Sequence, residues 1–504
     1  MGDDHADSSV SMDEISKIAA RLGVSLPDHG AVREAVAEAL VETGTLASAP
    51  SLGPGRVDAE RSENHEKDEY NAWITRCRVS AATKGPLAGQ RVGVKDNLAL
   101  AGFPMTCGSR ALAPFEPKID ATAVSRLLRA GATVVGKTNM DAFAFGGTGD
   151  LQAFGATLNP ADPGHIAGGS SSGSAAAVAA GECDIGVATD QAGSVRGPSA
   201  WCGCVGMKPT HGLVPYTGGF STDRSLDHLG FITRSVEANA QALGVAAGPD
   251  VQEGALLDPR QSRHGEGGDP ERYVPGDADA NLGDVTLGVV DNGFGRTVSE
   301  PGVDKTVREG IDTLVGAGAN KHTVSLPELA LALPLMDTLV ALSVSAGPLE
   351  HDGVQTGAGG WHWTHLADEL CRLVEEHPEE LPVPVILLRA IGAALSERNR
   401  SGAYAEGKNA MLVVERRLAE RFESCDVLAL PATPMTAFEH VDLPWMERIA
   451  RNADVLVNTA IFNHTGHPAL TVPCGEHDGL PVGLQLVAPH FAEARLYRVA
   501  TALD

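Results

Sequence analysis

The sequence predicts an α/β fold in which helices cover both faces of a central mixed, twisted β-sheet. From about residue 85 to residue 250, short apolar strand segments alternate with helical segments, which is typical of sheets built with crossover connections. The same alternation returns after about residue 285 and again near the C-terminus. With 504 residues and 43% hydrophobic composition, the chain can also bury a large core.

The first 68 residues are expected to form a separate helical segment with a linker. Ser11-Met12-Asp13-Glu14 is a capping box, and it opens a helix that carries Ile15, Ile18, Ala19 and Leu22 on one face. A second helix is predicted near 32–42, and a polar linker rich in Ser, Gly and Pro follows to about residue 68. We expect these helices to pack on the main domain or on a partner subunit.

Residues 69–504 are predicted to form the main domain, with its elements in the following order. The strands are expected at 92–94, 133–135, 285–290, 322–324, 427–430 and 482–487, and the helices at 122–130 and 303–315. Residues 252–282 are poor in apolar residues and are interpreted as a surface excursion. Residues 336–422 are mainly helical by their pattern and are expected to be an insertion that shapes a pocket.

Charge and composition exclude several classes of protein. The chain has 39 basic and 65 acidic residues, a net charge of −26, which argues against nucleic-acid and anionic-membrane partners. No apolar run approaches the roughly 20 residues needed to span a bilayer. The acidic N-terminus is unlike a signal peptide, and eight scattered cysteines form no disulfide framework, so a cytoplasmic location is predicted.

The cysteines and histidines do not have the spacing of a metal site. Cys202-Gly203-Cys204 lacks a second thiol or histidine pair at zinc spacing, so packed core thiols are expected there. The 17 histidines show no ligand spacing either, and His211, His464 and His467 are interpreted as packing residues. Neither a metal nor another cofactor is therefore predicted.

Two serines, Ser170 and Ser194, lie in segments unusually rich in glycine and alanine. The segments read GGSSSGSAAA from Gly168 and ATDQAGSVR from Ala188. Glycine beside a nucleophile lets the backbone approach the reacting group and aim N–H groups at a developing oxyanion. The flanks of Ser194 do not form a G-x-S-x-G elbow, and no phosphate-binding loop is present, which leaves a serine activated by a neutral lysine.

These segments and several others resemble the amidase signature family. The matching motifs are GGSSSGSAAAVAAG from Gly168, DQAGSVRGP from Asp190, VGVKDN from Val92, GKTNMD from Gly136, CGCVGMKPT from Cys202, TGHPA from Thr465 and GLPVGLQ from Gly479. The resemblance is dense over about 85–245 and thinner over 425–500. It implies the amidase-signature fold.

The resemblance also implies site residues. Ser194 would be the nucleophile, Ser170 the bridging serine after a cis peptide bond to Gly169, and Lys95 the ultimate base. The backbone N–H groups of Gln191, Ala192, Gly193 and Ser194 would form the oxyanion hole, while Gly169, Gln191 and Gly197 would contact the substrate. A lysine that acts as a base near neutrality needs its pKa lowered by about three units, which burial can supply.

Three positions depart from the family pattern. Ser172 and Ala192 stand where glycines are usual, so their backbone dihedrals must accommodate a Cβ. Gly197 replaces a bulkier residue and is expected to widen the acyl pocket or to allow a close backbone contact. Asp190 and Arg196 are interpreted as a structural ion pair that holds the nucleophile loop.

The predicted function is hydrolysis of a carboxylic amide, a linear non-peptide C–N bond, through an acyl-enzyme on Ser194 with release of ammonia or an amine. Within the family, the segment from His211 to Gly218 (HGLVPYTG) most resembles enantioselective aliphatic and aryl amidases. One alternative is a carbamate or ester hydrolase with the same triad. Another, ranked lower, is the amidase-like component of a tRNA-dependent amidotransferase. A small-molecule amide is the expected substrate, and a homodimer is compatible with the sequence.

Overall fold

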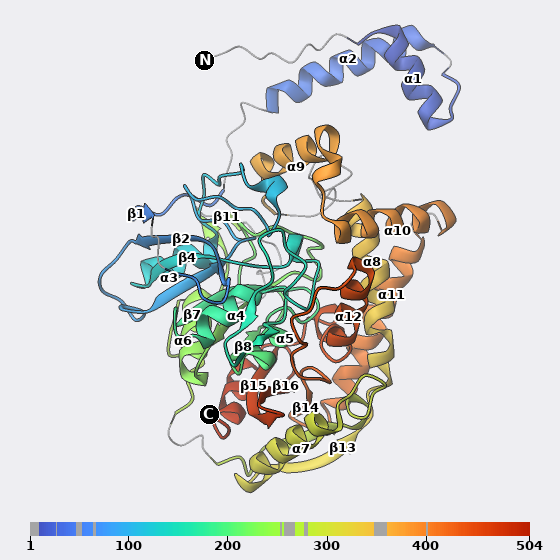
Figure 1. Ribbon diagram of the computed structural model, residues 1–504. Coiled ribbons are helices and arrows are strands. Elements are labelled where there is room, and N and C mark those ends of the chain that lie inside the picture. Colours follow the sequence, from blue (N-terminus) through green and yellow to red (C-terminus); the bar gives the residue numbers. More distant parts are fainter. Residues whose placement is uncertain are drawn as a thin grey trace. The chain divides into compact units, whose positions relative to one another are not determined.

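The computed structural model describes residues 10–26, 28–46, 53–63, 67–252, 255–256, 268–276, 281–346, 360–399 and 402–504 (Figure 1). The chain divides into two compact units, Met1–Gly53 and Pro54–Asp504. Each unit is described separately below.

The first unit contains helices α1 (Met12–Leu22) and α2 (His29–Leu46). The predicted capping box is present: Ser11 Oγ accepts from the Glu14 backbone N–H at 3.2 Å, and the Glu14 carboxylate accepts from the Ser11 N–H at 2.7 Å. Ile15 and Ala19 are buried, whereas Leu22 is exposed. The amphipathic face is therefore narrower than the sequence pattern predicts.

The second unit is built on one mixed sheet of twelve strands. Its spatial order is β1 (Glu60–Glu63), β2 (Trp73–Ser80), β4 (Thr133–Thr138), β3 (Arg91–Lys95), β7 (Ile185–Asp190), β9 (His228–Thr233), β8 (Val205–Lys208), β15 (Ala469–His477), β16 (Leu480–Val487), β14 (Val427–Pro431), β12 (Thr286–Val290) and β13 (Asn320–Val324). β3 is parallel to both β4 and β7, and β12 is parallel to both β13 and β14, while the other neighbouring pairs are antiparallel.

Helices flank this sheet, as the alternating pattern predicts (Figure 1). α4 (Ser172–Ala179) and α5 (Arg196–Trp201) pack on its central strands and contact each other. A second contiguous group contains α3 (Thr122–Arg129), α6 (Val236–Ala246) and α14 (Glu493–Ala500), and α7 (Pro301–Gly316) packs on β14, β15 and β16. The core between sheet and helices is continuous and almost wholly aliphatic.

The predicted helical insertion is present. It consists of α8 (Ala332–Ala346), α9 (Thr364–Glu376), α10 (Val383–Asn399) and α11 (Gly402–Arg421); α12 (Trp445–Leu456) and α13 (Ile461–His464) follow β14. α8 packs against both α10 and α11.

Two regions differ from the sequence expectation. The segment assigned to the N-terminal linker contributes β1, a short polar edge strand whose exposed pattern gives no strand signal. Most of the surface excursion at 252–282 lies outside the described residues; its described part contains the small hairpin of β10 (Val251–Gln252) and β11 (Ala255–Leu256). The small hairpin of β5 (Leu158–Asn159) and β6 (Asp162–Ile166) also lies outside the main sheet.

Within the described residues, one helical stretch, Pro327–Ser345, is long and apolar enough to cross a membrane by length and composition. Half of it is buried inside the protein. A core helix of a soluble protein has the same properties, so this stretch is weak evidence for a membrane span.

Candidate active site

The sheet register brings Lys95 and the segment before Ser194 to one edge. β3 and β7 are adjacent and parallel, with Val94 opposite Val187, so Lys95 and Asp190 both end their strands on the same side. α4 packs on these two strands, and Ser170 lies just before it. Residues about 75 to 100 positions apart in the chain therefore meet where two parallel strands end.

The Lys95 amine is held by uncharged oxygens. Its Nζ donates to Ser170 Oγ at 2.8 Å, to Thr189 Oγ1 at 2.9 Å and to the Thr189 carbonyl oxygen at 3.3 Å. Asn97 Nδ2 also donates to Thr189 Oγ1, at 3.0 Å. The Gly169–Ser170 peptide bond is cis. Lys95 and Ser170 are fully buried.

Burial sets the protonation of Lys95. Desolvation lowers its pKa from 10.5 to about 7, while the charges of Asp141 and Asp190 act in the opposite direction. Burial likewise raises the pKa of Asp141 to about 7, although its two oxygens accept the N–H groups of Gly149 and Leu151 at 3.0 and 2.8 Å. The amine is thus able to exchange a proton near neutral pH.

The nucleophile loop is anchored by the predicted Asp190–Arg196 ion pair. The guanidinium donates to the carboxylate through Nε and Nη2, both at 3.0 Å, and both side chains are fully buried. Burial opposes ionisation of Asp190, but Arg196 holds its pKa well below the usual range. Arg196 also reaches Gln485 Oε1 at 2.7 Å and Asn463 Oδ1 at 2.5 Å, which ties the loop to the C-terminal part of the chain.

Ser194 lies inside this anchored loop and is 3% exposed. In the part of the chain that the structure describes, no hydrogen bond joins its hydroxyl to Ser170. The Lys95–Ser170 half of the predicted relay is therefore formed, and the Ser170–Ser194 half is open. Catalytic hydrogen bonds commonly tighten only when substrate is bound.

The backbone donors near Ser194 are not all available. The Gly193 N–H donates to Asp190 Oδ1 at 2.7 Å, so it is already engaged. Gly193 has φ +140°, and a Cβ there would collide with the Thr459 side chain, so glycine is required. Of the four N–H groups expected in the oxyanion hole, those of Gln191, Ala192 and Ser194 remain as candidates.

The three departures from the family pattern are accommodated. Ala192 and Ser172 are not among the residues with positive φ, so their Cβ atoms introduce no backbone strain. Gly197 is buried on α5, and a Cβ there would lie 3.6 Å from Val455 Cγ1 and 3.9 Å from Thr433 Cγ2. It thus faces α12 and the segment after β14. Gly169 faces Asp141, whose carboxylate occupies the space of a Cβ.

Gln191 is buried, at 6% exposed. Its Nε2 donates to the Tyr216 hydroxyl at 2.9 Å and to Asp227 Oδ1 at 3.2 Å.

The three histidines singled out by the sequence have packing contacts. His211 Nε2 meets the Arg224 carbonyl oxygen at 2.9 Å, His464 Nε2 meets the Ala332 carbonyl oxygen at 3.1 Å, and His467 Nδ1 meets Thr465 Oγ1 at 2.9 Å. Burial lowers the pKa of His464 to about 4, so that ring is neutral. These contacts agree with the interpretation of the three residues as packing residues.

Sequence reasoning missed two residues at the site. Thr189 holds the Lys95 amine, and Asp141 lies against Gly169 and influences Lys95. Both occur inside motifs already recognised, ATDQAGS and GKTNMD, but a threonine before an aspartate and an aspartate after a methionine carry no local sign of their role.

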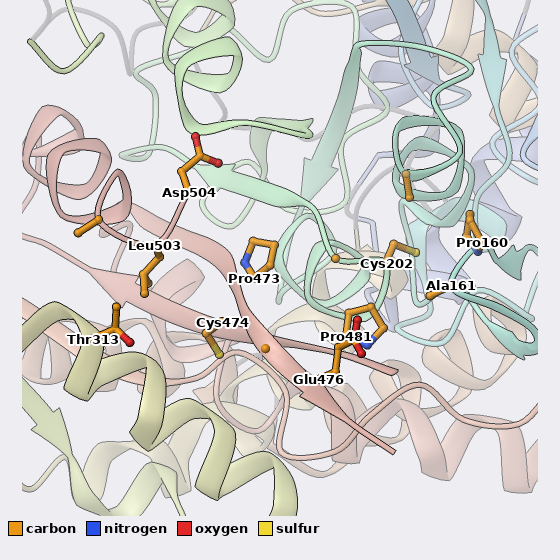
Figure 2. A pocket seen from close by; sticks show the side chains of 14 residues that line it. Pro160, Ala161, Cys202, Thr313, Pro473, Cys474, Glu476, Pro481, Leu503 and Asp504 are labelled. Carbon is orange, nitrogen blue, oxygen red and sulfur yellow. The ribbon is translucent and has the colours of Figure 1, made fainter. Parts of the chain in front are cut away.

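Other potential sites lie elsewhere. Within the described residues, His377, Glu379 and Glu380 are the group of side chains whose ligand atoms lie close enough to hold a metal ion, and they are largely exposed. A cavity of about 700 Å³ lies between the end of α5, the bulge of β15 and the C-terminus, lined by Cys202, Cys474 and Asp504 among others (Figure 2). Lys95, Ser170 and Ser194 are not among its lining residues.

Comparisons with known proteins agree with this geometry. The family model described as Amidase matches residues 66–497. One of the subunits of glutamyl-tRNA(Gln) amidotransferase from Natronomonas pharaonis is 39% identical over 447 residues, covering 86% of this chain and all of the relative. An enantioselective amidase of Rhodococcus rhodochrous is 37% identical over 444 residues, covering 86% and 83%. A solved amidase structure, 25% identical with TM-score 0.66, covers 98% of this chain and 94% of its own.

Proposed function

Because this chain belongs to the amidase signature family, we propose that it hydrolyses a carboxylic amide through an acyl-enzyme on Ser194, releasing ammonia or an amine. The expected substrate is a small linear, non-peptide amide, and the expected location is the cytoplasm. The observation that carries the proposal is the 2.8 Å hydrogen bond between Ser170 and a fully buried Lys95.

The proposed reaction uses this pair as a proton relay. Neutral Lys95 accepts the Ser170 hydroxyl proton while Ser170 takes the proton of Ser194, whose Oγ attacks the substrate carbonyl carbon. The candidate N–H groups of Gln191, Ala192 and Ser194 would stabilise the oxyanion. The protons then return along the relay to the leaving nitrogen, the C–N bond breaks, and water hydrolyses the acyl-enzyme by the same route.

The same relay would also serve a carbamate or an ester, because an acylating serine tolerates other leaving groups. The amide is preferred here because the matched family and the Rhodococcus relative are amidases. Hydrolysis of a panel of amides, anilides, carbamates and esters of the same acids would rank these leaving groups.

A second candidate function is that of the amidotransferase component. The observation favouring it is the 39% identity over the whole length of the Natronomonas relative, which is stronger than the low rank given to this function by sequence reasoning. Against it, a solved amidase matches 98% of the chain and so extends into Met1–Gly53, whereas the amidotransferase match covers 86%. Co-purification of different subunits, with activity confined to glutamine, would support the amidotransferase.

The decisive experiment concerns Ser194. We expect Ser194→Ala to lower kcat/KM on amides by at least about 10³-fold without unfolding the chain, because the acyl acceptor is lost. Mass spectrometry after fluorophosphonate treatment should place the adduct on Ser194. Ser171→Ala is the matched control, since Ser171 Oγ bonds the Thr189 carbonyl oxygen at 3.2 Å. An adduct on Ser170 or Ser171 would contradict the assignment.

A further inference from the structure

The carboxamide of Gln191 has a defined orientation. Both of its N–H donors are used, one by the Tyr216 hydroxyl and one by Asp227 Oδ1. A carboxylate only accepts, and the Tyr216 hydroxyl donates its own proton to the Phe220 carbonyl oxygen at 2.9 Å. Both partners therefore require the nitrogen of Gln191, and its oxygen must point elsewhere.

Asp227 is itself held firmly. Its Oδ2 accepts from Ser221 Oγ at 2.5 Å and its Oδ1 accepts from the Thr222 N–H at 3.3 Å. The segment 216–227 thus forms a rigid support behind Gln191. Such a support limits rotation of the carboxamide, because turning it over would place the amide oxygen against a carboxylate.

The oxygen of Gln191 is left without a donor. Oε1 is buried, and it has no hydrogen-bond partner among the described residues. Buried side-chain oxygens are nearly always paired, so an unpaired one three positions before the nucleophile needs an explanation. The bound substrate can supply the donor, because a primary or secondary amide carries an N–H group and an ester carries none.

We propose that Gln191 Oε1 accepts a hydrogen bond from an N–H group of the bound substrate and so selects amides over esters. This inference rests on the proposed function, and it adds the residue that discriminates between two leaving groups served by one relay. A site built to pair a substrate N–H disfavours the analogue that lacks it, because the protein acceptor is then buried unpaired.

The test compares a primary amide and a methyl ester of the same acid, benzamide with methyl benzoate and propionamide with methyl propionate. In Gln191→Met, which keeps the length but removes the acceptor, the ratio of kcat/KM for amide over ester should fall about tenfold or more. The amide rate should fall while the ester rate stays constant or rises. Tyr216→Phe should shift the ratio in the same direction by less, since Asp227 still holds the carboxamide.

Gln152→Met is the matched control. Gln152 is also a buried glutamine with an unpaired Oε1, and its Nε2 donates to the Gly149 carbonyl oxygen at 2.8 Å, outside the nucleophile loop. Its ratio should equal that of the wild type. An unchanged ratio in Gln191→Met, or equal losses on amide and ester, would overturn the inference. Failure of the proposed function is a different result, namely activity that survives Ser194→Ala.

Discussion

Lys95 illustrates how one residue trades stability for chemistry. Its amine is fully buried against Ser170 and Thr189, and burial lowers its pKa from 10.5 to about 7. The folded state therefore prefers the neutral amine, whereas the unfolded chain keeps it protonated up to about pH 10. Between these two pKa values the unfolded state binds more protons, so the free energy of unfolding rises with pH.

We expect the rate to follow the same titration. Below the Lys95 pKa the amine is charged and cannot accept the relay proton, so kcat/KM should rise about tenfold per pH unit up to about pH 7 and then level. A pH profile on a neutral amide measures this. A limb that instead fell as the pH rose through 7 would contradict a lysine base.

Lys95→Met should separate the two effects. It removes the relay base, so turnover should be lost, and it removes a buried ionisable group, so the melting temperature at pH 7 should rise by several degrees. The gain should shrink towards pH 10, where the wild-type lysine is neutral in both states. His467→Gln is the control for histidine activation: if it were as inactive as Lys95→Met, the serine–serine–lysine relay would be wrong.

The segment from the end of β7 through α5 joins the nucleophile to the packing of the whole unit. Arg196, at the start of α5, links the Asp190 carboxylate to Asn463 and Gln485. Gly197 follows it and faces Val455 on α12. A change at Gly197 therefore acts on helix packing one residue away from the anchor of the nucleophile loop.

Substitutions at Gly197 should distinguish packing from pocket size. Gly197→Ala places its Cβ at ordinary contact distance from Val455 and Thr433, so it should raise the free energy of unfolding by about 0.5–1 kcal/mol through helix propensity. Gly197→Ile should lower it by about 1–3 kcal/mol through overpacking. Thermal melts measure both.

The same pair of variants tests the expected acyl pocket. If Gly197 borders the acyl group, Gly197→Ile should reduce kcat/KM for benzamide about tenfold more than for propionamide. Equal losses on both substrates would assign Gly197 to packing alone and leave size selection to other residues, with the helical insertion at 336–422 as the next place to look.

Across the whole chain, negative charge exceeds positive charge by 26. Like charges on a compact molecule repel one another, and salt screens exposed charges beyond a Debye length of about 3 Å at 1 M. The buried pairs, such as Asp190–Arg196, are screened much less. Salt should therefore reduce the net repulsion without dissolving the anchors of the site.

We expect the melting temperature to rise by several degrees between 0.05 and 1 M NaCl at constant pH, since screening removes net repulsion. A matched concentration of sucrose, which is excluded from the surface but carries no charge, controls for solvent exclusion. A melting temperature that fell with NaCl would show that exposed attractive pairs outweigh the excess of negative charge.

Much of the fold could be predicted because its elements carry local signals. The strand ending at Lys95, the strand at Val427–Pro431 and the helix at Pro301–Gly316 all lie where hydrophobic periodicity indicates them. The edge strand Glu60–Glu63 was missed because its residues are polar and mostly exposed, and its pairing with β2 supplies what its own sequence does not.

From the residues alone came the chemistry of this protein: two serines in glycine-rich segments, a lysine that ends a strand, and a family pattern specific enough to assign roles. The contacts that make this chemistry work lie far apart in the chain. Arg196 meets Gln485 across 289 positions, and Lys95 meets Thr189 across 94. The engaged N–H of Gly193 and the unpaired oxygen of Gln191 are likewise visible only in the folded chain. Burial and hydrogen-bond pairing depend on every element that packs around a group, and no local stretch of sequence encodes them.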